Sequence, residues 1–136
     1  MISKKMKYAI KALTYLARYS SKENCVRTMD IAQEESIPKK FLEQILLELK
    51  KAELVNSIQG NAGGYYLVKP AHLINLAEIY RLFEGPIALI SCASDNFYTR
   101  CEDCKDEQKC KIRRSVRKIR NQNLAAMEQV TIQSLS

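Results

Sequence analysis

The chain has 136 residues, of which 46% are hydrophobic, and a formal net charge of +7. This length suits one compact domain with an extension and is too short for two full-sized domains. No apolar run approaches the roughly 18 residues that a membrane span needs. The N-terminus has the charge of a signal peptide but not its apolar stretch. We therefore expect a cytoplasmic protein that makes no membrane contact.

The charge is distributed unevenly along the chain. Residues 1–70 carry 12 basic and 7 acidic side chains, residues 71–104 carry 2 and 5, and residues 105–136 carry 8 and 3. A basic N-terminal half suits contact with nucleic-acid phosphates, because neutralising phosphates releases counterions. A solvated basic surface explains the same charge equally well.

The first 70 residues predict three helices followed by a hairpin. Apolar residues at helical spacing indicate an amphipathic helix over 3–20. We expect Thr28 to N-cap a short second helix that ends near residue 35, and Pro38 to lie in the first turn of a third helix that runs to about residue 52. Two β-prone runs, at 54–58 and 65–68, flank a turn rich in Gly and Asn. Together these elements predict a winged helix-turn-helix.

The remaining residues predict one shorter helix, a loop and a long terminal helix. Asn75 and Glu78 resemble a capping box at the start of the shorter helix, which Gly85 and Pro86 would end. The last helix is expected from about residue 111 to 134. The fold class is thus mainly α with a small β-hairpin. The expected segments are a winged DNA-binding domain at 1–70, a connecting helix at 71–90, a cysteine-rich loop at 91–110 and a dimerisation helix at 111–136.

The last helix carries apolar residues at the 4-3 spacing of a coiled-coil seam. A single long helix at the end of a small domain cannot bury that stripe alone. We therefore expect a homodimer, whose two-fold symmetry would suit a palindromic operator. The alternative is that the helix folds back on its own domain. The seam consists of Ile112, Val116, Ile119, Asn123, Ala126 and Val130.

Four of the five cysteines, Cys92, Cys101, Cys104 and Cys110, fall within 19 residues. A reducing cytoplasm disfavours structural disulfides, so the cluster points first to metal or redox chemistry. Thiolates are soft, strong donors, and four of them suit an iron–sulfur cluster of either the 2Fe–2S or the 4Fe–4S type. The fifth, Cys25, is expected to be a buried small hydrophobe rather than a ligand.

Other uses of the cysteines stay open. Structural zinc is plausible, although zinc ribbons usually show two C-x2-C pairs and this chain has one. A thiol–disulfide switch needs only two reactive thiols, whose pKa values the neighbouring basic residues are expected to lower. A thiol oxidoreductase using Cys101 and Cys104 would need a βαβ setting, which is absent, so we do not expect an enzyme. Three roles stay open for the basic run, which are to offset the charge of a cluster, to contact DNA backbone or to form a solvated helix face. The run consists of Lys109, Lys111, Arg113, Arg114, Arg117, Lys118 and Arg120.

Taken in order, these segments resemble the IscR/NsrR family of bacterial winged-helix regulators. The resemblance rests on residues 7–13, on the Phe-Leu-Glu-Gln-Ile-Leu run at 41–46, on Gly63-Gly64-Tyr65 and on residues 83–87. It implies a homodimeric repressor or dual regulator that binds double-stranded operator DNA. In such a protein the third helix would enter the major groove and the hairpin tip would contact the minor groove.

The resemblance also implies particular DNA contacts. Glu and Gln can read cytosine and adenine edges, while Lys suits phosphate or guanine. Glu43 is otherwise a solvated charge or a partner of Lys39 or Lys40. The family commonly places Arg before the wing glycines, where this chain has Gln59, so the wing gives no ground to expect an A-tract preference. The implied DNA-binding residues are Thr28, Pro38, Lys39, Lys40, Glu43, Gln44, Gln59, Asn61, Gly63 and Gly64.

For the cluster, the resemblance implies three cysteines in this loop, the last two separated by five residues as Cys104 and Cys110 are. Some relatives complete the set with His or a carboxylate. Cys101 is then the fourth ligand. Alternatively, Cys101 replaces Cys104 and the fourth ligand is Glu102, Asp103 or Asp106. Gain, loss or oxidation of the cluster would change how the dimerisation helix seats, and with it operator affinity.

Overall fold

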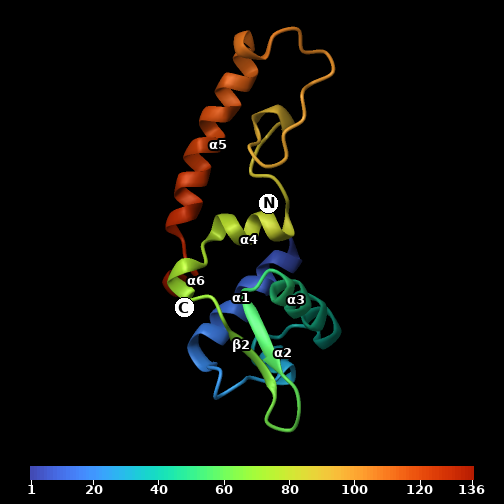
Figure 1. Ribbon diagram of the computed structural model, residues 1–136, viewed down its shortest axis with the longest axis vertical. Coiled ribbons are helices and arrows are strands. Elements are labelled where there is room, and N and C mark those ends of the chain that lie inside the picture. The colour runs from blue at the N-terminus through green and yellow to red at the C-terminus, as the bar shows by residue number, and fades with distance from the viewer.

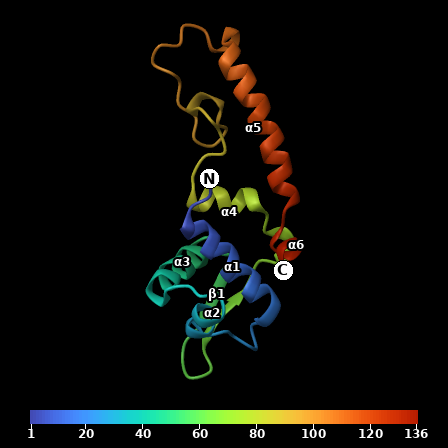
Figure 2. The same cartoon turned by 180° about the vertical axis from the view of Figure 1, so that it is seen from behind.

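The computed structural model describes residues 1–136 and is mainly helical with one two-stranded hairpin, as predicted. A helical and β-hairpin unit forms one end of an elongated molecule (Figure 1). One long helix leaves this unit and carries the cysteine-rich segment at its far end, as the reverse view also shows (Figure 2). None of the helices combines the length and the apolar character that a membrane-spanning segment needs.

Helix α1, Lys4–Tyr19, is the central packing element of the winged unit. Ser3 caps its N-terminus by accepting a hydrogen bond from the Met6 N–H at 3.1 Å, which satisfies one of the free donors of the first turn. The inward stripe of α1 is fully buried and packs against α3 and α6. Burial of this stripe agrees with the predicted amphipathic helix.

Helices α2, Thr28–Glu34, and α3, Lys39–Lys51, form the helix-turn-helix. Ser36 turns the chain between them with a left-handed backbone, φ 54°. Two predicted caps are corrected. Arg27 rather than Thr28 precedes the first helical residue of α2, and Thr28 makes no capping hydrogen bond. Pro38 is the N-cap of α3 rather than a residue of its first turn.

The hairpin consists of β1, Val55–Ile58, and β2, Gly64–Leu67, in antiparallel register. The end of α3 directs the chain into β1. Glu53 adopts φ 61°, and the Leu54 N–H donates to the Leu49 carbonyl at 3.0 Å, a turn that satisfies the last carbonyls of a helix. Leu54 and Val55 are buried, so the base of the wing belongs to the core.

The hydrophobic core continues beyond residue 70. Helix α4, Leu76–Phe83, follows a single 3₁₀ turn, Ala71–Leu73, and contributes the fully buried Ile79. The predicted capping box is half correct: Asn75 accepts from the Glu78 N–H at 2.9 Å. The Glu78 carboxylate instead accepts two hydrogen bonds from Lys69, both at 2.9 Å.

The predicted terminal helix is broken near its end. Helix α5 spans Lys111–Gln129, and a separate short helix, α6, spans Ile132–Leu135. Thr131 caps α6, and the Ile132 N–H donates to the Ile74 carbonyl at 2.9 Å. The Ile132 side chain is fully buried in the winged core. Helix α5 therefore ends five residues early because the chain turns back to bury Ile132.

Candidate functional site

The outer face of α3 is free for a ligand. Lys39, Lys40, Glu43 and Gln44 are all exposed, while the opposite face of the helix is buried. Lys39 and Glu43 approach to 3.9 Å with both side chains half exposed. Such a surface pair contributes at most about 0.5 kcal/mol, so either side chain can exchange its partner for a base or a phosphate.

The wing tip lies beside the start of α2. Gln59, Gly60 and Asn61 are exposed there, and the Asn61 carbonyl accepts a hydrogen bond from the Arg27 guanidinium at 2.7 Å. Two backbone hydrogen bonds between Val26 and Tyr65, at 2.8 and 2.7 Å, join the hairpin to the segment before α2. The wing is thus held at the N-terminus of α2.

The wing also contacts α3. Lys50 Nζ donates to Ser57 Oγ at 2.8 Å. Burial, followed by the nearby negative charge of Glu43, raises the pKa of the Tyr65 hydroxyl. The outer face of α3, the start of α2 and the wing tip therefore belong to one connected surface. It contains Thr28, which is half-buried, and the glycines Gly63 and Gly64.

The four clustered cysteines line one cavity of about 450 Å³. Its wall also contains Asp103 and Asp106 but not Glu102, among the carboxylates proposed as ligands. Nowhere in the chain do three or more His, Cys, Asp or Glu side chains converge closely enough to hold a metal ion. The donor type and the shared cavity fit a thiolate-bound metal group, whereas the four sulfurs do not converge on one point.

Cys92 and Cys101 form the closest pair, with the two Sγ atoms 3.8 Å apart. Two sulfurs bound to one tetrahedral zinc at about 2.3 Å would lie about 3.8 Å apart, so this pair already has the spacing of metal ligands. The hydrogen bond that Cys101 donates to Cys92 raises the pKa of the Cys101 thiol, as do burial and the neighbouring acidic groups. For Cys101 the expected lowering of the pKa by basic residues is therefore wrong.

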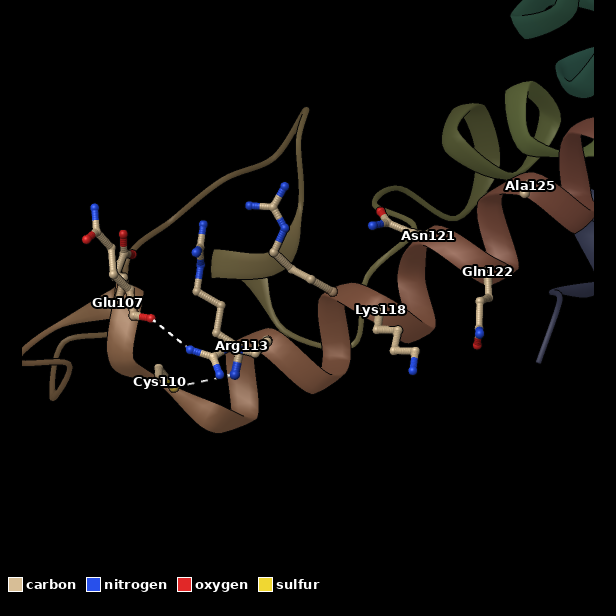
Figure 3. Close-up of a pocket in the computed structure, with 10 residues that line it drawn as sticks. Glu107, Cys110, Arg113, Lys118, Asn121, Gln122 and Ala125 are labelled. Carbon is tan, nitrogen blue, oxygen red and sulfur yellow. Dashed lines mark hydrogen bonds between the residues drawn. The ribbon is translucent and has the colours of Figure 1, made fainter.

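Cys110 begins α5 and links the cavity to that helix. It is the N-cap residue, and its Sγ accepts a hydrogen bond from the Arg113 N–H at 3.4 Å. Arg113 Nε also donates to the Cys92 carbonyl at 2.9 Å. Figure 3 shows both Cys110 and Arg113 at the start of α5, with Lys118 further along the helix. One arginine thus joins two of the four cysteines to the first turn of α5.

A second connection lies further along α5. Arg120 is 6% exposed and makes an ion pair with Asp95, which follows the 3₁₀ turn Ser91–Ala93. Arg117 approaches the same carboxylate at 3.6 Å. Arg117 and Arg120 therefore bind the cysteine segment through Asp95. Lys111 and Lys118 are exposed.

Four basic residues of α5 line a groove of about 560 Å³ along this helix (Figure 3). The N-terminal end of α5, where this groove begins, lies at the opposite end of the molecule from α3 and the wing (Figure 1). The residues that line it include Arg113, Arg114, Arg117 and Lys118. Within one protomer these cations are therefore remote from the proposed DNA-binding face.

Cys25 stands apart from the other four cysteines. It is half-buried, and its Sγ lies 3.6 Å from the Lys22 carbonyl oxygen. The expectation of a buried side chain is therefore wrong, because Cys25 lies in the loop before α2 and keeps partial exposure.

Three residues that shape the site, Arg27, Asp95 and Arg120, were not singled out for these roles by their sequence. Arg27 donates a hydrogen bond to the carbonyl of Asn61, 34 positions later in the chain. Asp95 accepts one from Arg120, 25 positions later. No local motif signals either contact.

The proposed coiled-coil seam on α5 is largely uncovered in the protomer. Ile112 is 67% exposed and Ile119 is 43% exposed. Asn123 and Ala126 are exposed, whereas Val116 and Val130 are half-buried. Four seam residues therefore keep exposed surface in the protomer, although α5 also packs against α4 and the 3₁₀ turn Ser91–Ala93.

Comparison with known proteins identifies the family. The Rrf2 family, described as "Iron-dependent Transcriptional regulator", matches residues 2–136. A putative HTH-type transcriptional regulator, rrf2-like, from Rhodobacter capsulatus is 39% identical and covers 99% of this chain and 91% of its own length.

Solved structures agree with this assignment. The structure of CymR, the global cysteine regulator of Bacillus subtilis, is similar with a TM-score of 0.75 and 28% identity, covering 99% of this chain and 95% of CymR. A structure named T. potens IscR has a TM-score of 0.73 and 25% identity, covering 99% of this chain and 85% of its own. Both the predicted family and the winged-helix fold are confirmed. The chain belongs to the Rrf2 family of DNA-binding transcriptional regulators, whose members are not enzymes.

Proposed function

We propose that the chain is a homodimeric cytoplasmic regulator whose affinity for operator DNA is set by an iron–sulfur cluster held by Cys92, Cys101, Cys104 and Cys110. One observation carries the proposal: all four thiols line a single cavity at the start of α5. A reducing compartment would keep these thiols available as ligands. The family description as iron-dependent points in the same direction.

For DNA binding, we assign the major groove to α3 and the minor groove to the wing tip. Glu43 and Gln44 are exposed and can pair with cytosine and adenine edges, while Lys39 and Lys40 suit guanine or phosphate. Thr28 and Pro38 lie at helix N-termini, where free backbone N–H groups favour phosphate. Gln59, Asn61, Gly63 and Gly64 complete the face at the hairpin.

For assembly, we assign α5 to the dimer interface. Ile112 and Ile119 are large apolar side chains left exposed in the protomer. Contiguous exposed apolar surface on a helix is typical of a protein–protein interface. A second copy of the same helix supplies a matching apolar stripe, and an isologous contact would bring two α3 helices onto one operator.

The link between ligand and operator runs through the protein's own contacts at α5. The cysteine thiolates would hold a cluster, which when bound would supply a change of charge on loss or oxidation. Cys110 begins α5, and Arg113 holds the Cys92 carbonyl, so movement of either cysteine displaces the first turn of the helix. A coupling of about 1–3 kcal/mol is enough for a roughly 5- to 150-fold change in DNA affinity.

The test uses protein purified without oxygen. We expect visible absorbance together with iron and sulfide, and a change in affinity for duplexes selected from a randomised pool when the metal is removed. Cys104→Ala should lose both the absorbance and the change in affinity, whereas the control Cys25→Ala should keep both. If Cys104→Ala retains cluster and response, the ligand set is wrong. Zinc without sulfide would indicate a structural metal instead.

A second candidate is a thiol switch between Cys92 and Cys101, favoured by the 3.8 Å between their Sγ atoms. A disulfide requires the sulfurs to approach to about 2.05 Å. In this step the two thiols give up two protons and two electrons to a small-molecule disulfide. The oxidant is reduced to two thiols as the Cys92–Cys101 bond forms.

Metal-free protein treated with oxidised glutathione tests the switch. We expect a Cys92–Cys101 linkage by peptide mass mapping and a change in DNA affinity that a dithiol reductant reverses. Cys101→Ser should abolish both effects, and Cys25→Ser should abolish neither. A linkage that forms without altering DNA affinity would reject this candidate.

A further inference from the structure

The hairpin of the wing carries no charge of its own. Residues 54–68 contain no Lys, Arg, Asp or Glu. A DNA-binding element normally needs a cation, because phosphate neutralisation supplies much of the affinity and a narrow minor groove concentrates negative potential. In the proposed complex, a cation at the wing tip of this chain therefore comes from another segment.

Arg27 supplies a cation at this position. Its guanidinium donates to the carbonyl oxygen of Asn61, at the hairpin tip, at 2.7 Å. The side chain is exposed and makes no ion pair with a carboxylate. A guanidinium has five N–H donors, so most of its donors stay free for another partner.

The backbone around Arg27 is fixed by the wing itself. Val26 and Tyr65 exchange two hydrogen bonds, at 2.8 and 2.7 Å. A Cβ at Gly64 would lie 2.3 Å from the Val26 carbonyl oxygen, so the segments approach this closely only because residue 64 has no side chain. Arg27 is thus positioned beside the wing tip before any ligand binds, which lowers the entropic cost of binding.

We infer that Arg27 is the minor-groove residue of the wing: its guanidinium, held on the Asn61 carbonyl, enters the groove beside the hairpin tip and favours A·T-rich flanks. This inference rests on the proposed DNA binding by the wing. A planar, forked guanidinium suits a narrow groove better than a flexible ammonium does. Arg27 directly precedes Thr28, so it lies on the same face of the molecule as the start of α2.

The probe is a set of duplexes that the wild-type protein selects from a randomised pool, with affinities measured at several salt concentrations. Arg27→Ala is expected to weaken binding about 10-fold or more and to remove the preference for A·T pairs in the flanks. Its salt slope should fall by about 1. Arg27→Lys should recover part of the affinity but not the A·T preference.

The matched control is Arg114→Ala. Arg114 is also an exposed arginine that donates to a backbone carbonyl, that of Gln108 at 3.4 Å, but it lies in the first turn of α5 and not on the proposed DNA-binding face. It should bind within about twofold of wild type, and circular dichroism should show that all variants are folded.

Different failures have different meanings. Wild-type affinity and flank preference in Arg27→Ala would overturn the inference and leave the proposed DNA binding intact. Arg27→Lys indistinguishable from wild type in both measurements would show a phosphate contact and also overturn the assignment to the groove. If the wild-type protein selects no duplex, the proposed function fails and the inference fails with it.

Discussion

Arg120, almost fully buried on α5, makes a two-point ion pair with Asp95, three residues beyond Cys92. One of its nitrogens, Nε, is buried without a hydrogen-bond partner. Asp95 is therefore the main compensation for a charge that has been removed from water. The pair fixes the start of the cysteine segment against the middle of α5.

Replacing Asp95 with Asn should lower the free energy of unfolding by about 1–3 kcal/mol, because a buried guanidinium loses its charged acceptor. Urea denaturation of the metal-free protein measures this. The control is Glu43→Gln, which breaks a half-exposed pair with Lys39 and should cost no more than about 0.5 kcal/mol. Equal, small effects of both substitutions would show that the Asp95 pair does not stabilise the fold.

The same pair should contribute to the pH dependence of stability. Hydrogen bonding from Arg120, and then the charges of Arg120, Arg117 and Arg81, lowers the pKa of Asp95 in the folded protein. The stabilisation is present above the unfolded value of about 3.9 and is lost as the pH falls through the lower folded pKa. The difference in unfolding free energy between wild type and Asp95→Asn should therefore be constant near neutrality and shrink only in strong acid. A difference that shrinks between pH 7 and 5 would contradict this assignment.

Residue spacing and turn-forming residues predicted the elements that depend only on nearby residues. The apolar stripe of α1, the helix-turn-helix and the Gly-rich hairpin follow from spacing and turn chemistry, and the structure has all three. The end of α5 could not be predicted in this way. It depends on Ile132 reaching a core assembled from residues more than 50 positions earlier, and helix propensity contains no information about that contact.

The candidate site was likewise predictable only in part from the sequence. The four cysteines were evident from their spacing, and the exposed residues of α3 from its periodicity. The residues that hold these groups in place were not evident from the sequence. The tertiary fold alone brings Arg27 to Asn61 and Asp95 to Arg120. A basic residue in a sequence gives no sign of whether it is solvated or bonded to a distant carbonyl.

Gly64→Ala should separate the wing from α2. Its new Cβ would lie 2.3 Å from the Val26 carbonyl oxygen, a contact that requires the backbone to move. Gly60→Ala is the control, since Gly60 also has a positive φ, 107°, but has open space around it. We expect Gly64→Ala to lower DNA affinity by at least 10-fold, with Gly60→Ala limited to a strain cost of about 1–2 kcal/mol in stability.

Hydrogen exchange of the Tyr65 amide, which donates to Val26 at 2.7 Å, reports directly on that separation. It should accelerate in Gly64→Ala and stay close to wild type in Gly60→Ala. Unchanged exchange in both variants would show that the bridge tolerates a side chain at residue 64.

Ile119→Asp should convert the proposed dimer to a monomer without unfolding the protomer. Ile119 is 43% exposed in the protomer, so a carboxylate there stays hydrated until a second copy covers it, and burying an unpaired charge costs several kcal/mol. Asn121→Asp, at an exposed position on the opposite side of the same helix, introduces the same charge away from the seam and should leave the molecular mass in solution unchanged. Light scattering over a range of protein concentrations measures the mass, and circular dichroism checks the fold. A protein that stays dimeric with Asp at 119 would place the interface elsewhere, and one that is monomeric without the substitution would remove the dimer from the proposed function.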